Sequence, residues 1–188
     1  MKKEIVLASA SPRRKELMKL ITDKYEVRAA NIDEAVPPCI PLDKSAEYVA
    51  RIKAEAAKRS DNEVIIGCDT MVMTPMGEIL GKPRDREDCR RMLRTLSGIT
   101  HHVCTGVCII FGSEVRTFTE TTEVVFDALT EEDIERYMDT GEPFDKAGGY
   151  GIQGKGSLLV TGIIGDYFNV VGLPVNHLYS ELRHMGVL

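Results

Sequence analysis

Two consecutive arginines stand in the first turn of a helix that we expect near the start of the chain. Ser11 is a suitable N-cap and Pro12 suits the first helical position, so Arg13 and Arg14 follow at once. The positive end of the helix dipole opposes cations there, so the arrangement makes sense mainly if an anion binds among them. The turn therefore indicates a phosphate site.

Four further charged residues stand at unusual places. Lys53 falls on the apolar stripe of an expected helix, where a lysine either extends past the edge of the core or meets an anion. Lys82 ends a short strand, Asp69 interrupts an otherwise apolar strand, and Glu34 lies in a proline-rich loop. Each one alone also fits a surface lysine, a structural ion-paired carboxylate or a solvated glutamate.

Together these residues describe a nucleotide phosphate site. The cations are Arg13, Arg14, Lys53 and Lys82. Glu34 and Asp69 can hold a divalent cation or activate water, whereas a protein that only binds phosphate needs neither. Repulsion between these carboxylates and a triphosphate requires a bridging Mg²⁺ or Mn²⁺. The sequence therefore predicts a metal-dependent phosphate hydrolase, with a sugar-phosphate binder as an alternative.

A glycine-dense segment lies at residues 148–156. Gly149, Gly151 and Gly154 match the spacing of a dinucleotide fingerprint, but the segment precedes an expected strand instead of opening a helix. The glycines let the backbone approach a ligand closely, and Gln153 offers a donor and an acceptor to a base edge. A tight structural turn is the alternative. The chain has no GxxxxGK[ST] loop, which counts against a nucleotide kinase.

Length and composition fit a single soluble domain that covers residues 1–188. The net charge is −5 and the pI is near 5.5, which argues against a nucleic-acid partner. No apolar run reaches the length of a signal peptide core or a membrane span, so we expect no membrane partner and a cytoplasmic location. The five cysteines form no CxxC pair, and we expect reduced core thiols.

The hydrophobic pattern predicts a mixed α/β unit. Expected strands cover residues 4–8, 25–29, 64–73, 100–111, 114–126 and 157–164. Expected helices cover residues 12–21, 43–59, 86–97 and 173–185, with a short one capped by Thr130 and Asp133. The two long alternating runs flank Gly112 and Ser113 as a hairpin, whose exposed edge is suited to a homodimer.

Several motifs follow one another along almost the whole chain. They are Ser9-Ala-Ser-Pro-Arg-Arg14, Asp33-Glu34, Ala50-Arg-x-Lys53-Ala, Gly67-Cys-Asp-Thr70, Ile79-Leu-Gly-Lys-Pro83, Leu96-Ser-Gly98 with His102-x-Cys-Thr-Gly106, and Phe144-Asp-Lys-Ala-Gly-Gly-Tyr150. In this order they resemble the Maf family of nucleoside triphosphate pyrophosphatases. Chance similarity does not produce so many independent motifs in order.

The resemblance implies a fold and a reaction. The fold is an elongated mixed β-sheet with flanking helices in two lobes around a cleft, similar to inosine triphosphate pyrophosphatases. The reaction is hydrolysis between the α and β phosphates, which yields a nucleoside monophosphate and pyrophosphate. Asp69 would accept the proton, and Glu34 would bind metal or water. The phosphate contacts would be Ser9, Arg13, Lys53 and Lys82.

The glycine segment and its companions also point to a substrate. The run from Gly149 to Gly154, with Arg13 and Thr70, looks like the family branch that hydrolyses dTTP and UTP. An amide such as that of Gln153 complements the adjacent carbonyl and imide groups of uracil or thymine. Two alternatives remain at this point: a 7-methyl-GTP pyrophosphatase of the same family, and a non-enzymatic nucleotide-sensing regulator of septum formation.

Overall fold

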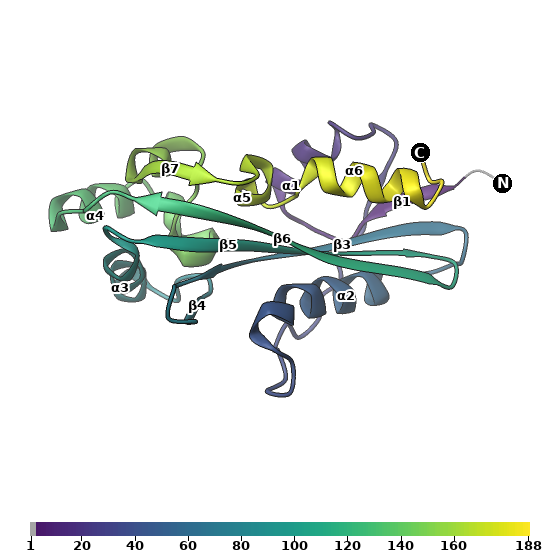
Figure 1. Ribbon diagram of the computed structural model, residues 1–188, viewed down its shortest axis with the longest axis horizontal. Coiled ribbons are helices and arrows are strands. Elements are labelled where there is room, and N and C mark those ends of the chain that lie inside the picture. The colour runs from purple at the N-terminus through teal and green to yellow at the C-terminus, as the bar shows by residue number, and fades with distance from the viewer. Residues whose placement is uncertain (1–2) are drawn as a thin grey trace. The chain divides into compact units, whose positions relative to one another are not determined.

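The structure of the protein is a computed structural model that describes residues 3–188. Its strands are β1 (Glu4–Leu7), β2 (Glu26–Val27), β3 (Glu63–Met73), β4 (Ile79–Leu80), β5 (Thr100–Phe111), β6 (Glu114–Phe126) and β7 (Val160–Ile164). They form a seven-stranded sheet in the order β2-β1-β3-β5-β6-β7, with β4 paired to β3 (Figure 1). β1 is parallel to β2 and β3, whereas β4 and β7 pair in antiparallel fashion with β3 and β6. The predicted mixed α/β class is confirmed.

Six α-helices and four 3₁₀ segments accompany these strands in the described chain. The α-helices are α1 (Pro12–Met18), α2 (Ser45–Ala57), α3 (Arg86–Leu96), α4 (Glu131–Met138), α5 (Tyr167–Val171) and α6 (Val175–His184). The 3₁₀ segments are η1 (Leu42–Lys44), η2 (Glu142–Asp145), η3 (Ala147–Gly149) and η4 (Gly154–Leu159). Within residues 3–188, no helix is long and apolar enough to span a membrane.

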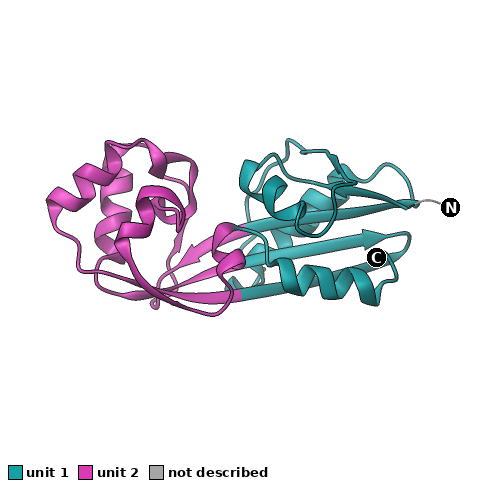
Figure 2. Ribbon diagram, turned by 90° about the horizontal axis from the view of Figure 1, so that it is seen from above, with its two compact units in different colours: residues 1–69, 105–120, 172–188 teal, residues 70–104, 121–171 magenta. Residues whose placement is uncertain are grey.

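The contacts divide the chain into two compact units (Figure 2). Unit 1 comprises residues up to Asp69, residues 105–120 and residues 172–188. Unit 2 comprises residues 70–104 and 121–171. The strands β3, β5 and β6 each contribute residues to both units, so the backbone passes between the units along three strands.

In unit 1, α2 and α6 cover opposite faces of the sheet. Glu47 of α2 accepts a hydrogen bond from Thr119 of β6, whereas Glu181 of α6 pairs with Arg116 of the same strand. Side chains alternate between the two faces along a strand, so the odd and even positions of β6 serve different helices. Figure 1 shows α2 and α6 on either side of the strands. The buried alanines of α2 pack on apolar residues of β1, β3 and β5.

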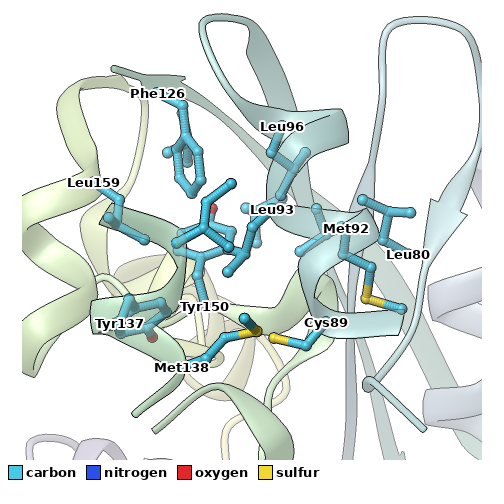
Figure 3. Packing of buried hydrophobic residues seen from close by; sticks show 14 residues of the cluster. Leu80, Cys89, Met92, Leu93, Leu96, Phe126, Tyr137, Met138, Tyr150 and Leu159 are labelled. Atoms are coloured by element: carbon cyan, nitrogen blue, oxygen red, sulfur yellow. The ribbon is translucent and has the colours of Figure 1, made fainter. Parts of the chain in front are cut away.

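Unit 2 has its own apolar core. The amphipathic helix α3 contributes Leu93 and Leu96, and α4 contributes Tyr137 and Met138. Figure 3 shows these side chains converging with Tyr150 from the glycine-dense segment. The core therefore holds one residue of that segment firmly in place.

Most predicted elements are confirmed, with differences at the less periodic ends. The hairpin strands end where predicted, and Thr130 and Asp133 form the expected capping box. The strand predicted at 157–164 begins only at Val160, because Ser157 donates to the carbonyl of Gly154 and holds the chain in 3₁₀ turns. The predicted 12–21 helix ends at Met18, and α5 was not predicted.

Candidate functional site

Helix α2 lies directly on β3 and β5 because glycines face it there. A Cβ on Gly67 of β3 would stand 2.1 Å from the carbonyl oxygen of Ala50. A Cβ on Gly106 of β5 would stand 2.2 Å from the carbonyl carbon of Ala46. Real Cβ contacts essentially never fall under 3.0 Å, so no other residue type fits either position without a shift. This close approach fixes the height of α2 above the sheet.

The approach lets Lys53 of α2 reach a carboxylate on β3. Lys53 Nζ donates to Asp69 Oδ1 at 2.7 Å and lies 2.8 Å from Glu34 Oε2. The Lys53 and Asp69 side chains are 12% and 14% exposed, whereas Glu34 is 55% exposed. One shielded ammonium therefore bridges two carboxylates that lie 35 positions apart in the chain. Of the two alternatives for an inward lysine, the structure shows the one that meets an anion.

The turn between β1 and α1 lies next to this group. Leu7 is in register with Ile66, and the amide of Ala8 donates to the Ile66 carbonyl, so Ser9 follows alongside β3 toward Asp69. As predicted, the side chain of Ser11 caps α1 by accepting from the amide of Arg14. The predicted phosphate turn and the carboxylates thus belong to the same end of unit 1.

Ser9 and Arg14 stabilise this turn through several hydrogen bonds. Ser9 Oγ accepts from the amide of Ser11 and from Arg14 Nη1, both at 3.3 Å. These contacts use the oxygen of Ser9 as an acceptor, which leaves its hydroxyl hydrogen to be donated elsewhere. Arg14 Nε donates to the carbonyl oxygen of Gly172 at 2.8 Å, which ties the turn to the segment that leads into α6.

The neighbours of Asp69 on β3 have different surroundings. Burial raises the pKa of the Cys68 thiol to about 11, so it stays protonated near neutral pH and is no nucleophile. Gly67 and Asp69 face α2, and the alternation of the strand places Thr70 on the other face. Thr70 also belongs to unit 2, where the chain continues.

Lys82 and the glycine-dense segment come together within unit 2. The carbonyl of Gly81 accepts from the amide of Gly148, and a Cβ on Gly149 would lie 3.3 Å from Pro83. Lys82 stands between these two contact residues and is exposed, as is Gln153 in the same unit. The residues on either side of Lys82 therefore contact the start of the segment that carries Gln153.

The nine predicted site residues divide between the two units. Unit 1 holds Ser9, Arg13, Arg14, Glu34, Lys53 and Asp69, and unit 2 holds Thr70, Lys82 and Gln153. Sequence reasoning named Gly67 and Gly106 only as parts of motifs and gave them no packing role, although a glycine inside a strand is a known sign of close backbone approach. It also missed Tyr137 and Glu142 as contacts of the glycine-dense segment.

The carboxylates suit a hard divalent cation. Glu34 Oε2 and Asp69 Oδ1 contact the same ammonium, so the two carboxylates already flank one small cationic group. Across residues 3–188, no group of three or more His, Cys, Asp or Glu side chains could hold a metal. Mg²⁺ is usually held by one or two carboxylates together with substrate phosphates, so a pair is sufficient. The donor set fits a metal that arrives with a phosphorylated substrate.

Comparisons with known proteins find relatives over nearly the whole chain. The family model described as Maf-like protein matches residues 4–185. Relatives named dTTP/UTP pyrophosphatase include that of Thermosipho africanus, which is 50% identical over 98% of this chain and 95% of its own length. The one from Carboxydothermus hydrogenoformans is 50% identical over 97% of this chain and 99% of its own length. The one from Bacillus pumilus is 44% identical over 98% of this chain and 97% of its own length.

Solved structures match at lower sequence identity. The Ham1 protein of Staphylococcus aureus superposes with a TM-score of 0.59 at 18% identity, covering 97% of this chain and 100% of its own. A HAM1 protein from Coxiella burnetii superposes with a TM-score of 0.58 at 13% identity, covering 97% and 99%. At such identities the likeness shows the fold alone.

Proposed function

The chain belongs to the Maf family, and from that premise we propose that it hydrolyses dTTP and UTP to the monophosphate and pyrophosphate, with Asp69 as the base. Relatives over nearly its full length carry the name dTTP/UTP pyrophosphatase. The expected pyrimidine branch therefore takes precedence over the 7-methyl-GTP alternative.

One observation carries the proposal. Asp69, Glu34 and Lys53 come from β3, a loop and α2, and their charged atoms meet at 2.7 and 2.8 Å. A hydrolase for phosphoanhydrides needs a base for water and a cation for the phosphates within reach of one another. This group supplies both in unit 1.

The proposed step transfers one proton and breaks one phosphoanhydride bond. Asp69 takes a proton from water while the water oxygen bonds to the α phosphorus. The bond between the α phosphorus and the bridging oxygen breaks, and pyrophosphate leaves with that electron pair. Lys53 is shielded from solvent next to Asp69, where its charge is screened little and can offset the charge that develops on the phosphates.

The remaining cations and hydroxyls bind the triphosphate. Ser9 donates its hydroxyl hydrogen to a phosphate oxygen while Arg14 and the Ser11 amide hold its oxygen. Arg13 and Arg14 supply charge at the same turn, and Lys82 is the further phosphate-binding cation that the family motifs imply. Arg14 also positions the turn through Gly172, so its loss should affect more than one phosphate contact.

Base recognition falls to Gln153, with Thr70 and Arg13 as companions. Gln153 is exposed in the glycine-dense segment, and its amide can donate to a carbonyl and accept from an imide N–H. Uracil and thymine present these two groups side by side. The resemblance to the pyrimidine branch supports this assignment.

A divalent metal, Mg²⁺ or Mn²⁺, would be held by Glu34 and Asp69. When bound, it neutralises phosphate charge and polarises the phosphoryl group. Lys53 occupies the space between these carboxylates without substrate, so it must leave at least one of them when a metal enters. The exposed Glu34 is the partner that moves most easily.

The family model spans residues 4–185, and three strands run through both units, which supports a single domain. The five cysteines are all free, which is typical of a reducing compartment and supports a cytoplasmic location.

Asp69→Asn tests the proposal. The amide keeps the shape of the side chain but accepts no proton at neutral pH, so turnover of UTP should fall by about 10²-fold or more. The measurement is pyrophosphate release from UTP with Mg²⁺ or Mn²⁺, together with the melting temperature. Asp61→Asn is the matched control, because Asp61 is 82% exposed and pairs only at the surface with Lys58.

Near-normal pyrophosphate release by Asp69→Asn would remove Asp69 from the role of base. Wild-type protein that binds UTP with metal present but releases no pyrophosphate would support the nucleotide-sensing regulator. A higher kcat/KM for 7-methyl-GTP than for UTP would move the protein to the other branch.

A further inference from the structure

The glycine-dense segment closes on itself in a tight turn that contains Gln153. A Cβ on Gly156 would stand 2.1 Å from the carbonyl oxygen of Gly151, so the two backbones touch at the base of the turn. Gly154, next to Gln153, has a φ of 66°, in the left-handed region that favours glycine. The turn 151–156 thus presents one exposed amide side chain on a short closed loop.

Two side chains from outside the turn hold its two ends. On one side, the amide of Gly151 donates to Tyr137 Oη at 3.1 Å. On the other side, the Glu142 carboxylate accepts from the amide of Lys155 at 3.0 and 3.1 Å and from the amide of Gly156 at 3.4 Å. Gln153 lies between these anchors in the chain.

Both anchors are themselves fixed. Tyr137 is 3% exposed and belongs to the core that contains Leu93 and Met138. Burial raises the pKa of Tyr137, so its hydroxyl stays neutral. The carbonyl of Glu142 accepts from Lys146 Nζ at 2.5 Å, and the Lys146 stem covers Gly151, where a Cβ would lie 2.8 Å from it.

We propose that Tyr137 and Glu142 are positioning residues that set base selectivity, because they hold the turn 151–156 so that the Gln153 amide meets the base in one place. This inference rests on the proposed function, in which Gln153 reads uracil or thymine. Neither residue need touch the substrate. A loose turn would let Gln153 sample other positions, which weakens binding of the matching base while the reacting groups of unit 1 stay as they are.

The test compares Tyr137→Phe and Glu142→Ala with wild-type protein on UTP and 7-methyl-GTP. Tyr137→Phe removes only the hydroxyl oxygen that accepts from the Gly151 amide and keeps the ring in the core. The variant therefore tests the hydrogen bond separately from the packing. Each lost anchor should raise KM for UTP about tenfold, while kcat changes by less than about twofold. The selectivity for UTP should fall by the same factor of about ten. Glu142→Gln keeps an acceptor oxygen and should recover part of the selectivity.

Two comparisons separate positioning from general damage. Glu131→Ala on α4 removes the same charge from a surface pair with Arg94 and should leave both substrates unchanged. In a Gln153→Ala background, Tyr137→Phe and Glu142→Ala should cause no further loss of selectivity, because there is no amide left to position.

The inference is overturned if either variant lowers kcat/KM equally for both nucleotides, if both leave selectivity unchanged, or if their effects multiply with that of Gln153→Ala. Wild-type protein without a preference for UTP would instead refute the proposed function itself.

Discussion

Gly67→Ala should separate Lys53 from Asp69 without touching either residue. The added methyl group would stand 2.1 Å from the carbonyl oxygen of Ala50, and contacts under 3.0 Å essentially do not occur. The next nearest atom is the amide nitrogen of Ala54, at 2.9 Å. Both neighbours are backbone atoms, so no flexible side chain can move aside to make room. Helix α2 must therefore move away from β3.

The size of the movement follows from these distances. Restoring an ordinary contact of 3.4 Å from the 2.1 Å approach requires a displacement of at least about 1.3 Å. Lys53 follows Ala50 by one helical turn and would move with it, so its 2.7 Å bond to Asp69 would lengthen beyond hydrogen-bonding range. A misplacement of about 1 Å can cost about 10²-fold in rate, and overpacking costs about 1–3 kcal/mol of stability.

The assay measures kcat for pyrophosphate release from UTP, with the free energy of unfolding from a urea titration. Gly162→Ala is the matched control, because a Cβ at Gly162 in β7 meets no atom within 4 Å. We expect the control to keep the wild-type kcat. We expect the kcat of Gly67→Ala, counted per folded molecule, to fall by about 10²-fold. If Gly67→Ala retains normal kcat and stability, the close approach of α2 to Gly67 does not position Lys53.

Three further predictions concern charge. Lys53→Met should lower pyrophosphate release by about tenfold or more but tighten Mn²⁺ binding without nucleotide in a calorimetric titration, because the ammonium no longer competes for Glu34. Burial lowers the pKa of His101 to about 4 from 6.5, so its neutral form stabilises the fold at higher pH. The free energy of unfolding should fall by about 3 kcal/mol as the pH drops from 6.5 to 4, and His101→Phe should flatten that dependence. The salt bridge with Arg28 lowers the pKa of Glu63 to about 2 from 4.5, so its contribution, present above pH 4.5, should disappear toward pH 2 and be absent in Glu63→Gln.

Elements with strong local signals could be predicted from the sequence. The hairpin strands end as expected because alternation and the Gly112 turn, with a φ of 59°, are encoded in neighbouring residues. Asp85 caps α3 through a similarly local contact, since its side chain accepts from the amide of Asp88 three residues later. The strand predicted at 157–164 was partly wrong because a local hydroxyl contact of Ser157 outweighs the apolar pattern.

The sequence could predict which residues form the candidate site, but not which contacts bring them together. The position of Lys53 on an apolar stripe left two outcomes open, and the choice depends on residues outside its own helix. Gly67 and Gly106 let α2 descend to the sheet, and only then does the lysine reach Asp69. No sequence pattern marks Tyr137 and Glu142 as anchors of the turn, because each accepts hydrogen bonds from backbone amides 13 or 14 positions away.

Counting charges would have pointed to the wrong helix. On α3, Arg86, Arg90 and Arg94 recur every four residues and form the most regular basic row of the chain. Yet Glu135 of α4 pairs with the first two, and Glu131 pairs with Arg94. These arginines already have carboxylate partners, and a phosphate would have to displace them. Lys53 has carboxylate partners too, but in the proposed function these are the groups that a substrate-bound cation would bind, which would release the charge of Lys53 for the phosphates.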